Sequence, residues 1–183
     1  MTTLDLYNIT LSIFDKEITQ ADLDSATPSK EVRLCNRYYP LAVLKAMREF
    51  DWSFLVVDIM SYTGDMTYNE DGYYKGYIYQ YDLPEDLLKL VWAGSEYPYE
   101  VLGDKLYCNE EPYHLWGIKK TLPETGVPED FHELIAYTLA YQIAPLLAPE
   151  GKLDQIALQK YTWTLSGLIS AECHNNSREV VDE

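Results

Sequence analysis

The sequence is poor in positive charge. It holds 14 lysines and arginines against 30 aspartates and glutamates, so its formal net charge is −16. Proteins that wrap nucleic acid neutralise its phosphates with lysine and arginine, and this composition therefore argues against a chain that wraps DNA or RNA. The charge does not exclude that DNA passes nearby, since a surface that repels the DNA backbone suits a channel.

Cysteines are few, and long hydrophobic runs are missing. Cys35, Cys108 and Cys173 are an odd number without metal-ligand spacing, so we expect free thiols in a reducing compartment. Nowhere do about 18 apolar residues follow one another, and the start MTTLDLYNIT lacks a basic segment before an apolar one. We therefore expect a soluble protein without a membrane span or a secretion signal.

Catalytic and metal-binding motifs are also missing. The patterns GxSxG, GxxxxGK[ST] and GxGxxG do not occur. His132-Glu133 begins like the helix of a zinc protease, but Ala136 stands where the second histidine ligand would be. We interpret this pair as a solvated helix edge, and we expect no catalytic residue, metal or cofactor.

Tyrosine, in contrast, is abundant, with 17 residues against four phenylalanines. Its apolar ring and polar hydroxyl suit half-buried sheets and protein contacts. The most informative segment is 79–86, YQYDLPED. It predicts a strand with Tyr79 and Tyr81 on one face, whose pairing ends at Pro84. Asp86 is placed to accept N–H groups of the following turn.

Helical periodicity marks both ends of the chain. We predict a short first helix over Leu4–Glu17 and a longer one from the N-cap Ser29, with a kink or a break at Pro40. A third helix begins at Pro128, and Pro145 bends its last turn. Its apolar ridge and its small-residue ridge consist of Ile135, Leu139, Ile143 and Leu147, and of Ala136, Ala140 and Ala144. The alanines would allow a close helix partner and suit contacts between subunits.

The final helix is predicted to end near Cys173, before a polar and flexible tail over 175–183. Between the helical arms, strand patterns predict a β-rich insertion. Phe54–Met60 and Tyr73–Tyr81 form one hairpin, and Gly103-Asp104 is the type II′ turn of another. Further segments are a strand over Tyr113–Lys119 and a short helical or extended piece over Glu85–Trp92.

The predicted fold class is therefore α+β: a mainly helical bundle with an inserted antiparallel β-rich subdomain and a flexible C-terminal tail. The 183 residues fit a single domain, which buries about 70% of its unfolded surface. Its parts are a helical arm over 1–53, the insertion over 54–122, a second helical arm over 123–174 and the tail over 175–183.

Five motifs follow one another from Ser29 to Ile169. They are Cys35-x2-Tyr38, Trp52-Ser-Phe54, Tyr79-x-Tyr81-x-Leu83-Pro84-x-Asp86, Val101-Leu-Gly103 leading to Leu106-Tyr107, and Phe131 opening a helix with Leu139-Ala140-x2-Ile143-Ala144. In this order and spacing, they resemble the head-to-tail adaptor proteins of tailed bacteriophages, the group that includes tail tubular protein A of short-tailed phages.

The resemblance implies a structural protein of the virion. Its copies would form a ring, typically of twelve, in the neck between the portal protein of the capsid and a downstream tail protein, after assembly in the host cytoplasm. DNA would pass through the ring without specific binding, and no membrane or enzymatic activity is implied. By the same resemblance, the portal would be the partner of the C-terminal tail, where Arg178, Val180 and Val181 could become ordered on binding.

Two alternatives remain at this point. A small hydrolase would use Asp82, Glu85 and Asp86 near a tyrosine-lined cleft, since paired carboxylates can transfer protons. A soluble assembly factor or binding module would share the tyrosine-rich composition but would be absent from mature particles.

Overall fold

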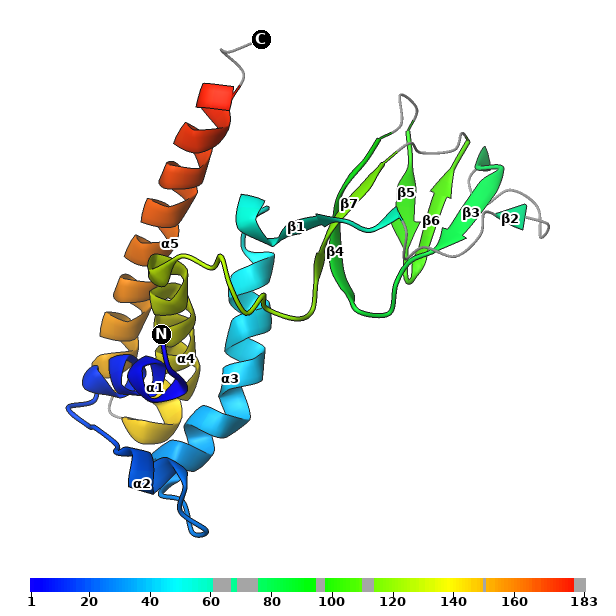
Figure 1. Ribbon diagram of the computed structural model, residues 1–183. Coiled ribbons are helices and arrows are strands. Elements are labelled where there is room, and N and C mark those ends of the chain that lie inside the picture. The colour runs from blue at the N-terminus through cyan, green and yellow to red at the C-terminus, as the bar shows by residue number, and fades with distance from the viewer. Residues whose placement is uncertain (61–66, 69–75, 95–97, 110–113, 150, 180–183) are drawn as a thin grey trace. The chain divides into compact units, whose positions relative to one another are not determined.

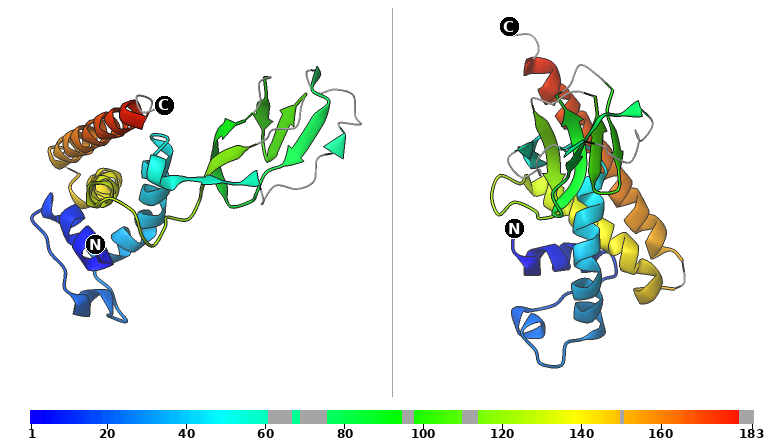
Figure 2. Two further views of the ribbon diagram at one scale, coloured as in Figure 1. Left: turned by 45° about the horizontal axis from the view of Figure 1, so that its top comes forward. Right: turned by 90° about the vertical axis from the view of Figure 1, so that its right-hand side faces the viewer.

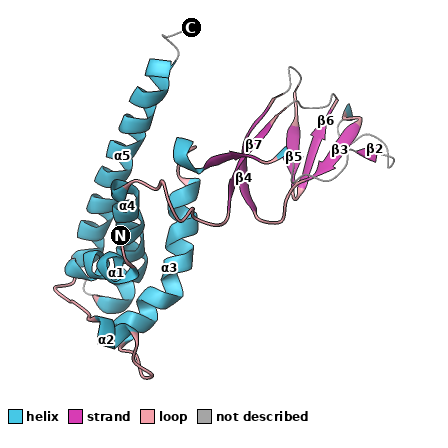
Figure 3. Ribbon diagram, in the orientation of Figure 1, coloured by secondary structure: helices cyan, strands magenta, loops and turns pink. Residues whose placement is uncertain are grey.

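The computed structural model describes two compact units. The helical unit comprises Met1–Phe50 and Glu124–Glu183, and the β unit comprises Asp51–Pro123, the place at which the sequence predicts an insertion over 54–122. Helices and antiparallel strands are segregated along the chain (Figures 1 and 3), which confirms the predicted α+β class. The structure describes residues 1–60, 67–68, 76–94, 98–109, 114–149 and 151–179, without the side chains of 67–68 and 175–179.

Five α-helices are described in the helical unit. They are α1 (Thr3–Ser12), α2 (Gln20–Leu23), α3 (Lys30–Arg48), α4 (Glu129–Leu147) and α5 (Leu153–Glu179). α1 begins with a capping box in which Thr2 and Asp5 exchange hydrogen bonds between side chain and backbone. It ends earlier than predicted, because Asp15 is left-handed (φ 53°) and the Lys16 N–H donates to the Leu11 carbonyl.

α3 begins as predicted, with the Val32 N–H donating to Ser29 Oγ at 3.3 Å. The helix continues through Pro40, so the alternative of a break there is wrong, although Figure 1 shows that the helix changes direction along its length. Pro40 is exposed, so the backbone carbonyl that loses its donor lies on the solvent side. Pro145 is likewise exposed within α4, which continues to Leu147.

α4 is the centre of the helical unit and packs against α1, α3 and α5. The left view of Figure 2 shows α4 end-on, with α3 and α5 beside it, and the Tyr161 hydroxyl of α5 donates to the Glu49 carboxylate at the end of α3 at 2.7 Å. The predicted apolar ridge is confirmed for Ile135, Leu139 and Ile143, which are fully buried, while Leu147 is half-buried. Most of the apolar surface of this helix therefore lies inside its own chain.

The alanine ridge of α4 is also used within the chain. Ala136, Ala140 and Ala144 are fully buried. α1 lies so close to α4 that Thr10 Oγ1 donates to the Ala136 carbonyl at 3.1 Å, which confirms the predicted close approach of a helix. The second expectation, that these alanines serve contacts between subunits, is wrong, because no surface of theirs remains exposed.

α5 continues to Glu179, beyond the predicted end near Cys173. The residues after Cys173 are polar, but they include no glycine or proline, and polarity alone does not end a helix. The first part of the predicted flexible tail is therefore helical. Residues 180–183 lie outside the described part of the chain.

The strands of the β unit form two antiparallel sheets. The first has the order β1 (Val56–Asp58), β7 (Leu115–Lys119), β4 (Leu87–Ala93). The second has the order β2 (Thr67–Tyr68), β3 (Tyr79–Asp82), β6 (Lys105–Cys108), β5 (Glu100–Leu102). A short 3-10 helix, η1 (Ser53–Leu55), precedes β1. The Glu85–Trp92 segment thus takes the extended alternative. The strand predicted over Tyr113–Lys119 is confirmed over Leu115–Lys119 as β7, while Tyr113 lies outside the described residues.

One predicted hairpin is correct and the other is wrong. β5 and β6 pair across Gly103-Asp104, where Gly103 has φ 64°. Among the described residues outside glycine, only Asp15 has a positive φ, so Asp104 does not, as a type II′ turn requires. The segment after Phe54 does not pair with the Tyr79 strand, because β1 pairs with β7 of the other sheet, while β3 pairs with β2 and β6.

Candidate functional site

The Tyr79–Asp86 segment forms a corner of the β unit. Tyr81 and Leu83 are buried in the core of this unit and the half-buried Tyr79 packs against them, so the predicted common face is confirmed. The Leu83 N–H donates to the Asp104 carbonyl at 2.7 Å as the last hydrogen bond before Pro84, which confirms that pairing ends there. The aromatic face therefore holds the unit together.

Asp86 was expected to accept N–H groups of the following turn, but it does not accept the Leu87 N–H. That N–H donates to the Pro84 carbonyl at 3.0 Å, while the Asp86 carboxylate lies 3.3 Å from Lys119 Nζ. This ion pair is largely exposed and contributes about 0–1 kcal/mol. The carboxylate at the end of the motif is thus paired with the neighbouring strand β7.

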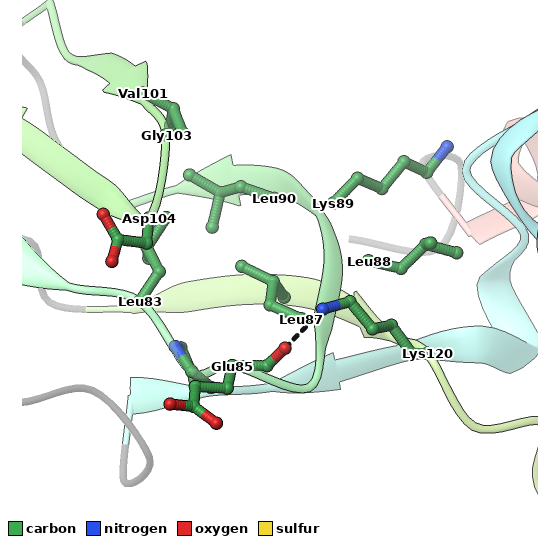
Figure 4. Close-up of a pocket in the computed structure, with 11 residues that line it drawn as sticks. Leu83, Glu85, Leu87, Leu88, Lys89, Leu90, Val101, Gly103, Asp104 and Lys120 are labelled. Carbon is green, nitrogen blue, oxygen red and sulfur yellow. Dashed lines mark hydrogen bonds between the residues drawn. The ribbon is translucent and has the colours of Figure 1, made fainter.

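The corner borders a small cleft of about 230 Å³ (Figure 4). Leucines of β4 form its floor, and the turn between β5 and β6 forms one side. Lys120 Nζ donates to the Glu85 carbonyl at the opposite side, as the dashed line in Figure 4 shows. The lining residues are Leu83, Pro84, Glu85, Leu87, Leu88, Lys89, Leu90, Val101, Gly103, Asp104 and Lys120.

The three carboxylates of the hydrolase hypothesis do not share this cleft. Asp82 lies outside it and is paired with Lys105 Nζ at 2.5 Å, and Asp86 also lies outside it. Only Glu85 is among the lining residues, and the cleft is lined by leucines where tyrosines were expected. The second carboxylate that lines the cleft is Asp104, which is not one of the three residues of the hypothesis. The geometry therefore does not bring Asp82, Glu85 and Asp86 together for acid and base catalysis at this place.

The remaining motif residues are structural. Trp52 is fully buried and caps η1, with its ring 6.1 Å from that of Phe54. Phe131 is fully buried in the first turn of α4. Three residues of the C-terminal tail are expected to bind the portal. The first of them, Arg178, lies in the last turn of α5, where no side chain is described. Val180 and Val181 lie outside the described residues.

The most exposed large apolar residue of the described chain was missed by the sequence interpretation. Trp163, in the middle of α5, is 70% exposed, and Leu41, on α3, is 54% exposed. A signal was present, because Gln155–Ala171 contains a single charged residue, Lys160, in a chain that is 24% charged. A surface helix normally carries charges on its outer face, so this deficit indicates a contact surface.

The histidines and cysteines of the described chain indicate no metal centre. No group of three or more histidine, cysteine, aspartate or glutamate side chains is close enough to hold a metal ion within the described ranges. Cys35 and Cys108 are buried, Cys173 is exposed, and all three are free thiols as predicted. His132 and Glu133 are half-buried on α4, so the predicted helix edge is only partly solvated, and desolvation lowers the pKa of His132.

Two groups buried at the contact of α1 with α3 make stability sensitive to alkaline pH. Burial raises the pKa of the Cys35 thiol to about 12 and that of Tyr7 to about 12, while the Tyr7 hydroxyl donates to Asn36 at 2.9 Å. The unfolded chain loses the thiol proton near pH 9, whereas the folded chain keeps it. Unfolding therefore releases a proton, and stability falls as pH rises through this window.

We expect the free energy of unfolding to decrease between pH 9 and 10 by up to about 1.4 kcal/mol on account of Cys35. Urea denaturation at several pH values measures this slope. Cys35→Ala should flatten it, even though the variant is less stable overall, and Cys173→Ala should leave it unchanged. An equal slope in the Cys35→Ala protein would show that the buried thiol is not its source.

No described helix is both long and apolar enough to cross a membrane. No protein-family model matches this chain, and no curated protein shows significant similarity to its sequence.

Proposed function

We propose that this protein is a head-to-tail adaptor of a tailed bacteriophage. Copies of it form a ring in the neck of the virion, with the portal protein on one side and a downstream tail protein on the other. Genomic DNA passes through the ring, whose acidic composition disfavours binding of the DNA backbone. The role is structural, with no cofactor or catalytic step.

One observation carries the proposal. The chain has an antiparallel β unit inserted between α3 and α4 of a helical unit, which is the architecture that the ordered motifs imply by resemblance. The motif residues Trp52, Tyr81, Leu83 and Phe131 are buried. They thus stabilise the two units, as residues that define a fold should, and they leave the exposed faces of the helices for partners.

The test is reconstitution with the cognate portal. The purified protein is mixed with portal rings and examined by electron microscopy and native mass spectrometry, and a ring of density on one end of the portal is expected. Peptide mass spectrometry of purified virions then separates an adaptor from an assembly factor, which would be absent. Failure to bind the portal together with absence from virions would refute the proposal.

The C-terminal residues are expected to contribute to portal docking. Deletion of 176–183 removes the last turn of α5 and the apolar Val180 and Val181, while the described packing of α4 against α5 involves earlier residues such as Ala157 and Leu168. We predict a circular dichroism spectrum that loses only the signal of the deleted helical residues, and an affinity for the portal lowered at least tenfold, measured by surface plasmon resonance. Val180→Ser with Val181→Ser is the matched full-length control, and it should show most of the loss. Equal affinities of truncated and full-length proteins would exclude this role for the tail.

A further inference from the structure

We infer that the exposed face of α5 in one copy of the chain docks onto the exposed face of α3 in the next copy. This contact would join the subunits of the proposed ring. The contact itself is argued from the two faces, and only the closure of the ring rests on the proposed function. The two faces differ in chemistry, and neither carries an acidic residue. The two helices both pack against α4 and meet where the Tyr161 hydroxyl donates to the Glu49 carboxylate at 2.7 Å, so the two faces lie on the sides of α3 and α5 that this packing leaves exposed.

The α5 face is an uncharged strip with two large apolar side chains, Ile156 and Trp163, among smaller polar ones. It consists of Ile156, Gln159, Trp163, Ser166 and Ser170, which follow one another at intervals of three and four residues and are all exposed. Trp163 is its largest side chain, and Ile156, about two turns before it, is 43% exposed. The neighbouring Gly167 has open space around it. Such a strip suits a protein partner better than water.

The hydroxyl groups on this face are already used. Ser166 Oγ donates to the Thr162 carbonyl and Ser170 Oγ to the Ser166 carbonyl, each at 2.8 Å within the same helix. These donors therefore stay paired when a partner buries the two serines. The single cation nearby, Lys160, lies 5.1 Å from the centre of the Tyr137 ring, at the edge of the strip.

The α3 face is basic, with an exposed leucine at its centre. Lys30, Arg33, Arg37, Leu41 and Arg48 are all exposed and share one side of the helix, away from its buried residues. At its first end, Lys30 Nζ donates to the Leu146 carbonyl of α4 at 2.7 Å and Arg33 donates to the Pro28 carbonyl at 3.1 Å, so the remaining part of the face is centred on Arg37 and Leu41. The helix contains one acidic residue, which lies off this face: Glu31 is paired with Lys16. Arginine side chains bind the face of a tryptophan ring through cation–π contacts, and both residue types are enriched at the centres of protein interfaces.

Charge selects a second copy of the chain as the occupant. Two chains with a formal charge of −16 repel each other over most orientations, and an approach of α3 to α5 avoids carboxylates on both sides. The positive α3 face is attracted by the overall negative charge of the neighbour. The Arg37 guanidinium lies 5.7 Å from the centre of the Tyr38 ring of its own chain, and in the inferred contact the exposed Trp163 ring of the neighbour joins this arrangement. DNA fits this face less well, because the rest of the chain repels it and Leu41 has no role there.

The position of the faces determines the kind of assembly. α3 and α5 each bury one side against α4, so their exposed sides point away from the bundle in different directions. A contact between unlike faces is heterologous, and each subunit then has one α3 face and one α5 face to offer. Repetition of such a contact produces a closed ring or an open helix.

The test uses two variants, each with one face impaired. Wild-type protein at about 100 μM is expected to associate in sedimentation equilibrium. Trp163→Ala and Arg37→Glu should each weaken association at least tenfold, with unchanged circular dichroism. An equimolar mixture should regain a 1:1 dimer that does not grow further, because the α3 face of the first variant and the α5 face of the second are intact. Lys120→Glu, with the same charge change in the β unit, and Leu102→Ala, which truncates another exposed side chain, are the controls.

Several results would overturn the inference. They are a monomeric wild type at this concentration, variants that associate like the wild type, and a mixture that stays monomeric while Trp163→Ala alone abolishes dimers, as two paired α5 helices would behave. If wild type and variants all form rings on the portal, the inference fails and the proposed function stands. If the wild type associates through these faces but ignores the portal, the proposed function fails and the contact stands.

Discussion

Replacement of Phe131 by alanine is expected to destabilise the helical unit by about 3–5 kcal/mol. The ring is fully buried in the first turn of α4, the helix that packs against α1, α3 and α5. Its removal leaves a cavity inside the helical unit, which packed helices fill only in part by small movements.

Denaturation in urea, followed by far-ultraviolet circular dichroism, measures the effect of Phe131→Ala. The matched control is Phe131→Leu, which keeps most of the volume and should cost less than about 1.5 kcal/mol. A loss below about 1 kcal/mol for the alanine variant would contradict the central place of Phe131 in the core.

The second large effect is expected at Gly117 in β7. A Cβ atom there would lie 2.6 Å from Leu87 Cδ1 and 3.1 Å from both the Lys89 carbonyl oxygen and Ile59 Cδ1. The leucine tip can rotate away, but the carbonyl belongs to the backbone of the paired strand β4, so the two strands must separate slightly. We expect Gly117→Ala to cost about 1–3 kcal/mol, and Gly117→Val more.

The control for Gly117→Ala is a glycine with free space. Gly167 in α5 has no neighbour within 4 Å of an added Cβ atom, and it sits in a helix. Gly167→Ala should therefore stabilise the protein by up to about 1 kcal/mol. Opposite signs for the two alanine variants in thermal denaturation are the expected outcome. A neutral Gly117→Ala would show that β4 and β7 tolerate the extra atom.

These substitutions also test the single-domain prediction, because Phe131 lies in the helical unit and Gly117 in the β unit. In a single cooperative domain, both variants lower the same unfolding transition. Two transitions, each shifted by one variant only, would show two units that unfold separately.

Local chemistry was the predictable part of this fold. Ser29 as an N-cap, Gly103-Asp104 as a II′ turn and the apolar period of α4 each depend on residues within a few positions of one another. Such signals can be read without knowing the rest of the chain. The alternation of Tyr79 and Tyr81 predicted their common face for the same reason.

Pairing between distant segments was not predictable. β1 satisfies the same strand pattern whether it pairs with the next strand or with β7, and only the packing of the whole β unit decides between them. The proline in α3 misled in a similar way, because its cost depends on whether its side of the helix faces water. The exposure of Trp163 was equally hidden, since a tryptophan at a helical position fits a core face as well as a contact surface.

The insertion of the β unit sets the order in which the chain can fold. α3 and α4 are neighbours in the helical unit, yet the whole of Asp51–Pro123 separates them in the sequence. During synthesis the β segment leaves the ribosome before α4 exists. The apolar side of α3 therefore cannot pack against α4 until the whole β segment has been made. If the β unit collapses first, it shortens the loop that α3 and α4 must close and lowers its entropic cost. Destabilisation of the β unit by Gly117→Ala should then also slow the formation of the helical unit, an effect on rate that no contact between the two helices would reveal.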